Sequence, residues 1–221
     1  MAFTILPRTQ HLATAIRHIG ILAALLFGAL FAPAAQAAPP DDADIAVDVE
    51  IVGDLVKITS SFHVEASLRE AWAVITDYDH AAAFISDLEY SRIESYVDNT
   101  LYVHQKGRAR VGPFSFPMES VSKILLTPFG RMETRLIRGT MKSSEGTTLI
   151  TVDDAGTRIT NHTESIPNIW IPPIVGRFFI AHEIRAKFGE LRVEILRRKK
   201  DRKSTRLNSS HSDRSRMPSS A

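Results

Sequence analysis

The stretch IVGRFFIAHEIRAKFGELRVEILRRKK, residues 174–200, decides the fold of this chain. Its apolar residues recur three or four positions apart, which is typical of a long helix with one apolar stripe. Arg177, Arg185 and Arg192 are expected on the opposite side of the helix. A helix of this kind has to bury its stripe against another layer of structure. The stripe consists of Ile174, Phe178, Ala181, Ile184, Phe188, Leu191 and Ile195.

An opening hairpin and two short helices are predicted near the start of the domain. Residues 47–51 alternate in polarity, and a Gly-Asp turn signal separates them from the strand pattern of residues 55–64. Ser67 followed by Glu70 has the form of a capping box, so a helix is predicted to begin after Ser67. A second short helix is expected over residues 81–85.

Residues 89–166 change to the period of β-strands. Segments rich in β-branched and aromatic residues alternate there with turn signals. Five or six antiparallel strands in meander order fit this pattern, and the sequence therefore predicts an α+β domain. The turn signals are Asp98-Asn99, Gly112-Pro113, Pro128-Phe129-Gly130, Glu145-Gly146 and Asp154-Ala155-Gly156.

The N-terminal end has the pattern of an export signal. Arg8 and Arg17 precede the apolar run 19–32, and residues 35–37 read Ala-Gln-Ala, the form that signal peptidase cleaves. We therefore predict a signal peptide over residues 1–37, a flexible leader over residues 38–44, and a location in a bacterial periplasm. The alternative is an uncleaved membrane anchor, but the 14 apolar residues are fewer than the roughly 20 that span a bilayer.

The C-terminal end is expected to lie outside the folded domain, which leaves residues 45–200. Residues 201–211 read DRKSTRLNSSH, which looks like the translation of a sequencing-library adapter. We therefore interpret residues 201–221 as a non-native, disordered tail; the alternative is a native basic tail. Without both ends the chain has 20 Lys and Arg against 23 Asp and Glu, so its charge does not indicate a nucleic-acid partner. The absence of Cys excludes disulfides, thiolate metal sites and a cysteine nucleophile.

Three segments together resemble the START-like helix-grip superfamily (SRPBCC), in particular its polyketide cyclase/dehydrase, lipid-transport and coenzyme Q-binding branch. They are WAVITDYDHAAAFISDLEYSRI (residues 72–93), GPFSFPMESV (residues 112–121) and the Pro-led C-terminal helix. The resemblance implies a curved antiparallel sheet wrapped around the long helix, with two short helices after the first strand. It also implies a pocket for a hydrophobic ligand, such as a lipid or an isoprenoid quinone, between the sheet and that helix.

Eight apolar side chains are expected to point into this pocket. Strand alternation places three of them, from Phe114 to Met118, on one face of their strand. The alternative for each residue is that it simply fills the core. No catalytic residue, metal site or cofactor is expected. The eight residues are Trp72, Phe84, Phe114, Phe116, Met118, Met132, Phe178 and Ile184.

Polar residues on the strands leave an enzymatic alternative open. His63 with Glu65, and His162 with Glu164, lie two residues apart, as in an acid–base pair, half a metal site or an ordinary solvated strand face. Residues 101–111 also alternate, with one strongly cationic face that is expected to face solvent. If that face pointed inward, it would steer an anionic group. It carries Tyr102, His104, Lys106, Arg108 and Arg110.

Two features suggest transient contact with a membrane surface. Residues 166–175 read IPNIWIPPIV, which fits either a pocket lip at the bilayer interface or a cover over the sheet edge. Residues 197–200 read RRKK, which complements the helix dipole and also suits anionic headgroups.

The sequence as a whole predicts an exported protein that binds or carries a hydrophobic small molecule without catalysis. Two alternatives remain: a cyclase- or dehydratase-like enzyme acting on a hydrophobic substrate, and an interaction module with a packed interior.

Overall fold

Eight strands of the described chain form one antiparallel sheet. The structure is a computed structural model that describes residues 44–111 and 114–214, with side chains from 44 to 110 and from 115 to 204. All of them belong to the unit Pro40–Ala221, and the predicted signal peptide lies outside the described residues. The strands are β1 (Ala46–Val52), β2 (Leu55–Val64), β3 (Leu88–Val97), β4 (Thr100–Val111), β5 (Phe114–Thr127), β6 (Arg131–Gly139), β7 (Met141–Asp153) and β8 (Gly156–Pro167).

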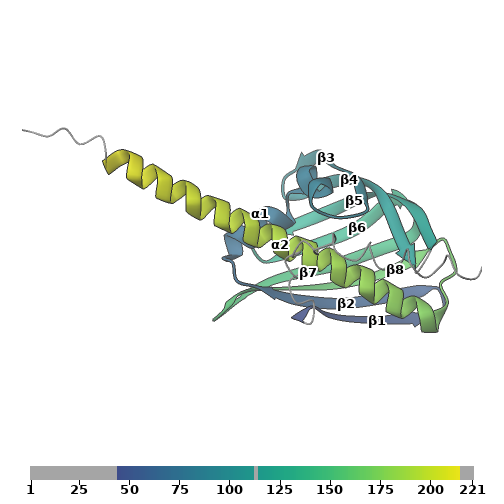
Figure 1. The fold of residues 1–221 in the computed structure, drawn as a ribbon. Helices are drawn as coiled ribbons and strands as arrows, with labels where there is room; N and C mark the ends of the chain where they lie inside the picture. The colour runs from purple at the N-terminus through teal and green to yellow at the C-terminus, as the bar shows by residue number, and fades with distance from the viewer. Residues whose placement is uncertain (1–43, 112–113, 215–221) are drawn as a thin grey trace, which may run out of the picture. The chain divides into compact units, whose positions relative to one another are not determined.

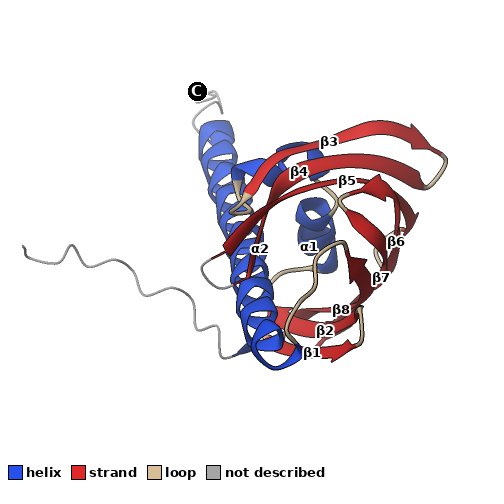
Figure 2. Cartoon of the chain, turned by 90° about the vertical axis from the view of Figure 1, so that its right-hand side faces the viewer, coloured by secondary structure: helices blue, strands red, loops and turns tan. Residues whose placement is uncertain are grey.

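The helices lie on the inner side of this sheet. The strand order is β1-β2-β8-β7-β6-β5-β4-β3, so β3 to β8 form a meander and the opening hairpin joins it through β2 and β8. Between β2 and β3 the chain forms α1 (Leu68–Ile75) and the 3-10 helix η2 (Tyr78–Ala83), and after β8 it forms α2 (Pro173–Arg214). Figures 1 and 2 show the sheet curving around α1, with α2 along its open side. The predicted α+β helix-grip architecture is confirmed, but the two short helices follow the second strand and not the first, because β1 and β2 form a hairpin before them.

Local signals account for the start of the domain. β1 and β2 pair from Ala46 with Ser61 to Val52 with Leu55, as the hairpin prediction requires. The Ser67 hydroxyl accepts from the backbone N–H of Glu70, and the Glu70 carboxylate accepts from the backbone N–H of Ser67 at 2.9 Å. This predicted capping box satisfies two backbone donors that the first turn of a helix otherwise leaves without partners.

Two clusters of buried side chains form the interior, and α1 connects them. Trp72 and Ile75 of α1 pack against both clusters. Burial of these side chains stabilises the position of α1 against the sheet by about 25 cal/mol per Å² of apolar surface removed from water. The first cluster contains Ile45, Phe62, Val64, Ala66, Ala71, Val74, Ile150, Ile159 and Ile195, and the second contains Leu101, Val103, Ile124 and Met132.

The predicted turn at Glu145-Gly146 is wrong, because both residues lie inside β7. The chain turns instead at Thr140, between β6 and β7. A Cβ on Gly146 would stand 2.9 Å from both the His162 carbonyl oxygen and the Thr163 hydroxyl of β8. Glycine is therefore required here for a close approach of two strands, a role that sequence alone does not distinguish from a turn.

The long helix continues past the predicted domain end at Lys200. It runs to Arg214, so the disorder expected for residues 201–214 is not observed; residues 215–221 lie outside the described residues. Residues 201–214 contain no Gly or Pro, and Arg197 Nη1 donates to Asp201 Oδ2 at 2.7 Å across the expected boundary. Pairs four residues apart stabilise a helix, which explains the continuation.

The prediction that Arg192 lies on the solvent side of α2 is also wrong. Arg192 is only 7% exposed, although the apolar stripe places it opposite the core. α2 contacts α1 as well as β1, β2 and β4, so more than one of its faces is covered. No helix in the described ranges is long and apolar enough to cross a bilayer.

Candidate functional site

A cavity of about 270 Å³ lies where α1, η2, β4, β5 and α2 meet, and we call it the α1–α2 pocket. Its volume is slightly below the range of about 300–1,000 Å³ that is usual for ligand pockets. Most of its wall is apolar, and polar side chains interrupt the wall at a few points. The apolar wall includes Val74, Ile75, Ala81, Phe84, Met118 and Leu191.

The segment between η2 and β3, residues 84–88, forms one wall of the pocket and is fixed to α2. The backbone N–H of Ser86 donates to Glu190 Oε2 at 2.9 Å. Its carbonyl oxygen accepts from Lys187 Nζ, also at 2.9 Å. Two residues one turn apart on α2 therefore hold both polar groups of one peptide segment.

Asp87 fixes the same segment to β4. Its carboxylate accepts from Arg110 Nε and Nη2, both at 2.7 Å, and this hydrogen bonding lowers the pKa of Asp87. Its carbonyl oxygen accepts from the backbone N–H of Arg108 at 2.8 Å. A Cβ on Gly107 would collide with that carbonyl oxygen and stand 3.1 Å from Leu88 Cα, so only glycine lets the segment approach β4 this closely.

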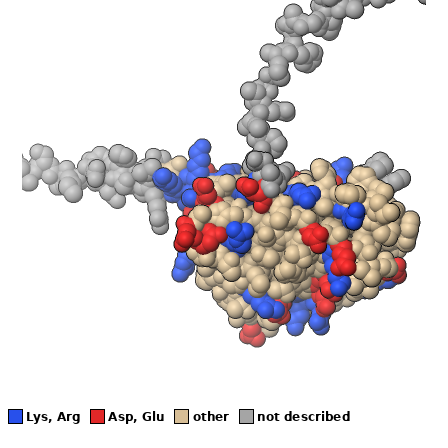
Figure 3. All heavy atoms as spheres, turned by 90° about the horizontal axis from the view of Figure 1, so that it is seen from below, with Lys and Arg blue, Asp and Glu red and all other residues tan. Residues whose placement is uncertain are grey.

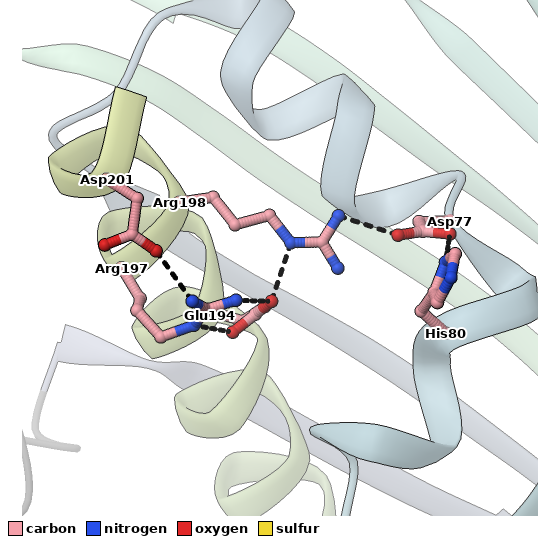
Figure 4. A network of polar contacts seen from close by, with 6 residues as sticks. All are labelled: Asp77, His80, Glu194, Arg197, Arg198 and Asp201. Atoms are coloured by element: carbon pink, nitrogen blue, oxygen red, sulfur yellow. Dashed lines mark hydrogen bonds and ion pairs between the residues drawn. The ribbon is translucent and has the colours of Figure 1, made fainter. Parts of the chain in front are cut away.

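Arg198 joins α2 to the end of α1 (Figure 4). Its Nη1 donates to Asp77 Oδ2 at 2.7 Å, and its Nε donates to Glu194 Oε1 at 2.6 Å. The guanidinium also lies over the ring of Phe84, 5.5 Å from the centroid, so it touches a residue of the pocket wall. Partial burial opposes ionisation of Asp77, but the hydrogen bonds from His80 and Arg198 outweigh this effect and lower its pKa.

Tyr78 is one of the residues that line the pocket. Burial raises the pKa of Tyr78, so the phenol keeps its proton throughout the physiological range. Among the described residues, no hydrogen bond to this hydroxyl is present. A bound ligand with an acceptor atom would meet a phenol that is free to donate.

The structure brings two of the eight predicted residues, Phe84 and Met118, into the pocket wall. Trp72 is part of the packed interior and lies 5.6 Å from the ring of Phe129, while Met132 is 4% exposed in the second cluster. For these two residues the core-filling alternative describes what is observed.

Three of the remaining predicted residues, Phe116, Phe178 and Ile184, do not line this pocket. Phe116 and Ile184 are half-buried elsewhere on β5 and α2, and the side chain of Phe114 lies outside the described residues. Phe178 is 63% exposed, so its expected inward orientation is not observed. Helical spacing identifies the apolar face of α2, but it does not show how far the sheet extends beneath that face.

Sequence reasoning missed Tyr78 and Lys187, which both line the pocket. Tyr78 stands between Asp77 and Asp79, and this polar stretch gives no signal for a pocket residue. A signal for Lys187 was present: it precedes Leu191 of the apolar stripe by four residues, so both lie on one face of α2.

The acid–base candidates on the strands are held by structural contacts. His63 Nε2 lies 3.1 Å from Asp153 Oδ1, and His162 Nδ1 lies 3.1 Å from the Thr59 hydroxyl. Within residues 44–110 and 115–204, no group of three or more His, Cys, Asp or Glu side chains is placed to hold a metal ion. Neither pair lines the α1–α2 pocket.

The cationic face of β4 points away from the core, as expected. Leu101 and Val103 are buried on the opposite face, whereas His104 contacts Glu94 and Glu119 at 3.1 and 2.7 Å. Arg108 at the far end of the strand is an exception, because it lines the pocket.

A larger hollow of about 500 Å³ lies over β5 to β8, on the sheet face that carries His162 and Glu164. Charged side chains of both signs line it, and several are already paired: Arg131 with Glu133 at 2.8 Å, and Arg135 with Glu145 at 3.3 Å. Figure 3 shows a similar mixture of signs on the face seen from below. This hollow lacks an apolar wall, so the α1–α2 pocket is the better candidate for a hydrophobic ligand.

Comparison with known proteins relates this chain to a family. A family model described as polyketide cyclase/dehydrase and lipid transport matches residues 64–186, which is more than half of the chain. No curated protein matches the chain in sequence.

Solved structures share the fold. A STAR-related lipid transfer protein from Xanthomonas axonopodis is 14% identical, with a TM-score of 0.57 over 69% of this chain and 93% of that one. The Zhui aromatase/cyclase from Streptomyces sp. R1128 is 15% identical, with a TM-score of 0.54 over 65% and 95%. A START superfamily protein from Mycobacterium smegmatis is 10% identical, with a TM-score of 0.52 over 66% and 99%.

Proposed function

Because the chain belongs to the polyketide cyclase/dehydrase and lipid transport family, we propose that it binds a hydrophobic small molecule in the α1–α2 pocket and carries it without chemical change. The observation that supports this most directly is the mostly apolar wall beneath η2, closed on one side by Leu191 of α2. The proposed ligand is a lipid or an isoprenoid quinone. Only part of a long chain fits inside about 270 Å³, so the remainder would extend through the mouth of the pocket.

Apolar contact alone gives such a ligand modest affinity. A molecule that fills the pocket buries on the order of 250 Å², which is worth roughly 6 kcal/mol at 25 cal/mol per Å². Association removes about 4 kcal/mol or more, so at most about 2 kcal/mol remains, which corresponds to a Kd of roughly tens of millimolar or weaker. Tighter binding requires either contacts outside the cavity or polar groups at its wall.

Uptake of Nile red, an uncharged dye whose fluorescence increases in apolar surroundings, tests the proposal. The variant Ala81→Leu adds carbon atoms at a buried position of the pocket wall and is expected to lower dye affinity at least about fivefold, since it removes space for the dye. Ala73→Leu on the exposed side of α1 is the matched control and should bind as the wild type does. Equal dye binding by both variants would place the ligand elsewhere.

We further propose that the lip around Trp170 contacts a membrane surface during transfer. Trp170 is 74% exposed and Ile174 is 73% exposed, and the half-exposed Val175 follows them along the chain. Tryptophan is favoured at the boundary between headgroups and hydrocarbon. Co-sedimentation with phosphatidylglycerol vesicles should decrease in Trp170→Ser, while the same change at exposed Tyr96 should have no effect. Vesicle binding that does not depend on Trp170 would contradict this proposal.

Export to a bacterial periplasm is proposed on the pattern of residues 1–37 alone. Expression of the full chain in bacteria, followed by N-terminal sequencing of the periplasmic fraction, should give a first residue of Ala38. An uncleaved chain that remains in the membrane fraction would support the anchor alternative.

A further inference from the structure

Two cations lie at one end of the α1–α2 pocket. Lys187 of α2 and Arg108 of β4 both line it, and both are close to Asp87. Lys187 uses one N–H for the Ser86 carbonyl oxygen, which leaves two of its three donors. The Arg108 side chain donates through Nε to the Ser115 hydroxyl at 2.7 Å, and its terminal nitrogens have no partner among the described residues.

The two carboxylates of the pocket wall are paired with other residues, and Glu190, one turn from Lys187, accepts from the Ser86 N–H. Asp87 is held by both nitrogens of Arg110, while Lys187 Nζ lies 4.0 Å from it, at the limit of an ion pair. Asp77, the other acidic residue of the pocket wall, is paired with Arg198 and His80 (Figure 4). Arg110 and Arg198, which pair with Asp87 and Asp77, do not line the pocket. The two cations that do line it, Lys187 and Arg108, are therefore not required to neutralise these two carboxylates.

Two other polar residues of the wall, Tyr78 and Gln105, carry donor groups that suit a ligand with an acceptor atom. The Tyr78 hydroxyl has no hydrogen-bond partner among the described residues, and Gln105 donates one of its two amide N–H groups to the Ser91 hydroxyl at 3.1 Å, which leaves the other. An anion hydrogen-bonded by an ammonium or guanidinium group forms stronger bonds than a neutral acceptor does. Such bonds would supply the affinity that apolar contact in a small cavity lacks.

We propose that the pocket selects a hydrophobic ligand that carries a carboxylate, with Lys187 and Arg108 binding the acidic head and the wall beneath η2 holding the apolar part. This inference rests on the proposed function and adds the chemical class of the ligand. The volume of about 270 Å³ equals that of roughly nine water molecules at about 30 Å³ each, which is close to the size of an eight-carbon fatty acid.

Displacement of Nile red by octanoate and by octan-1-ol tests this choice, because the two compounds share a chain and differ in the head. The measured quantity is the ratio of the two half-displacement concentrations, at low ionic strength and pH 7.5. Lys187→Met and Arg108→Gln are each expected to shift this ratio against octanoate by at least about tenfold. Lys200→Met removes an exposed cation from the same helix and should leave the ratio unchanged. Added salt should reduce the octanoate preference of the wild type.

The possible outcomes distinguish failure of the acidic-head inference from failure of the proposed function. Unchanged octanol displacement in Lys187→Met shows that the pocket is intact, so a lost octanoate preference then supports the acidic-head site. An unaltered ratio in both variants, with Nile red still bound, overturns the acidic-head inference and leaves the proposed function standing. Failure of the wild type to take up Nile red overturns both.

Discussion

Arg198 shows how a single side chain can hold elements that are far apart in sequence. It reaches Asp77 at the end of α1, Glu194 on its own helix and the ring of Phe84. The RRKK segment 197–200 is therefore largely engaged in contacts within the protein, and Lys199 likewise donates to the carbonyl oxygen of Glu65. These contacts support neither lipid headgroup binding nor a simple helix-dipole role for Arg198.

Replacement of Arg198 by Met should lower the free energy of unfolding by about 1–3 kcal/mol, because hydrogen bonds between charged, partly buried groups are lost. Arg197→Met is the matched control: its side chain is 57% exposed and its ion pairs stay within α2. The control should lose less than about 1 kcal/mol. Urea unfolding measures both, and equal losses would argue against a link between α1 and α2 through Arg198.

The same contacts predict how stability depends on pH. Hydrogen bonds from Arg197 and Arg198 lower the pKa of Glu194 below its ordinary value of 4.5, and the pKa of Asp77 lies below 3.8. The unfolded chain therefore takes up protons first as the pH falls, so these groups stabilise the fold above about pH 4.5 and lose that contribution at lower pH. Urea unfolding between pH 3 and 7 should show a shallower acid loss in Arg198→Met than in the wild type. Parallel curves would contradict this assignment.

The sequence predicted the pocket residues only in part, for a physical reason. Met118 lines the pocket whereas Phe116 on the same strand face does not, because strand alternation gives the face of a side chain but not which part of that face the pocket covers. Tyr78 was missed because no periodic pattern describes the short 3-10 helix in which it lies, and Lys187 was missed because helical spacing does not show its contact with Ser86. Phe178 was misplaced because its exposure depends on where the neighbouring sheet ends.

At the scale of elements, the fit between the 84–88 segment and β4 depends on Gly107. Alanine there would collide with the Asp87 carbonyl oxygen, which cannot move away without breaking its bond to the Arg108 N–H. Gly107→Ala should cost about 1–3 kcal/mol of unfolding free energy and weaken Nile red binding. Gly130→Ala is the control, because its Cβ would meet only the Thr127 carbonyl oxygen at 4.0 Å. A thermal unfolding midpoint for Gly107→Ala equal to that of the control would show that the segment adapts.

Elements whose signals lie within their own sequence were predictable. Features that depend on a neighbouring strand of the sheet were not. The capping box at Ser67 and the first hairpin were correct because their contacts join residues that are close in sequence, at most as far apart as Ala46 and Ser61. The second short helix begins earlier in the chain than predicted: it was expected over residues 81–85, and η2 covers Tyr78–Ala83. Gly146 was mistaken for a turn because its requirement comes from β8 across the sheet.

At the scale of the whole domain, the part of α2 beyond Lys200 is expected to add little. Its described contacts include the ion pair of Arg202, whose side chain is half-exposed, with Glu70 at 3.8 Å, and a hydrogen bond from the Ser204 hydroxyl to the Lys200 carbonyl oxygen within the helix. A chain that ends at Lys200 should lose less than about 1 kcal/mol of unfolding free energy and keep its affinity for Nile red. A chain that ends at Arg192 is the comparison, because it also loses fully buried Ile195 and should not fold stably. A large loss in the longer truncation would show that residues 201–214 belong to the folded domain.

The pairing of β2 with β8 brings together residues about 100 positions apart, as in the contact of Thr59 with His162. The opening hairpin therefore cannot pair with β8 until almost the entire domain has left the ribosome. Loop closure over such a span slows folding, because entropy is lost before long-range contacts compensate for it. A nascent chain that stops before Gly156 would thus present β2 as an open edge, exposed to chaperones or to aggregation, however well its earlier segments had formed.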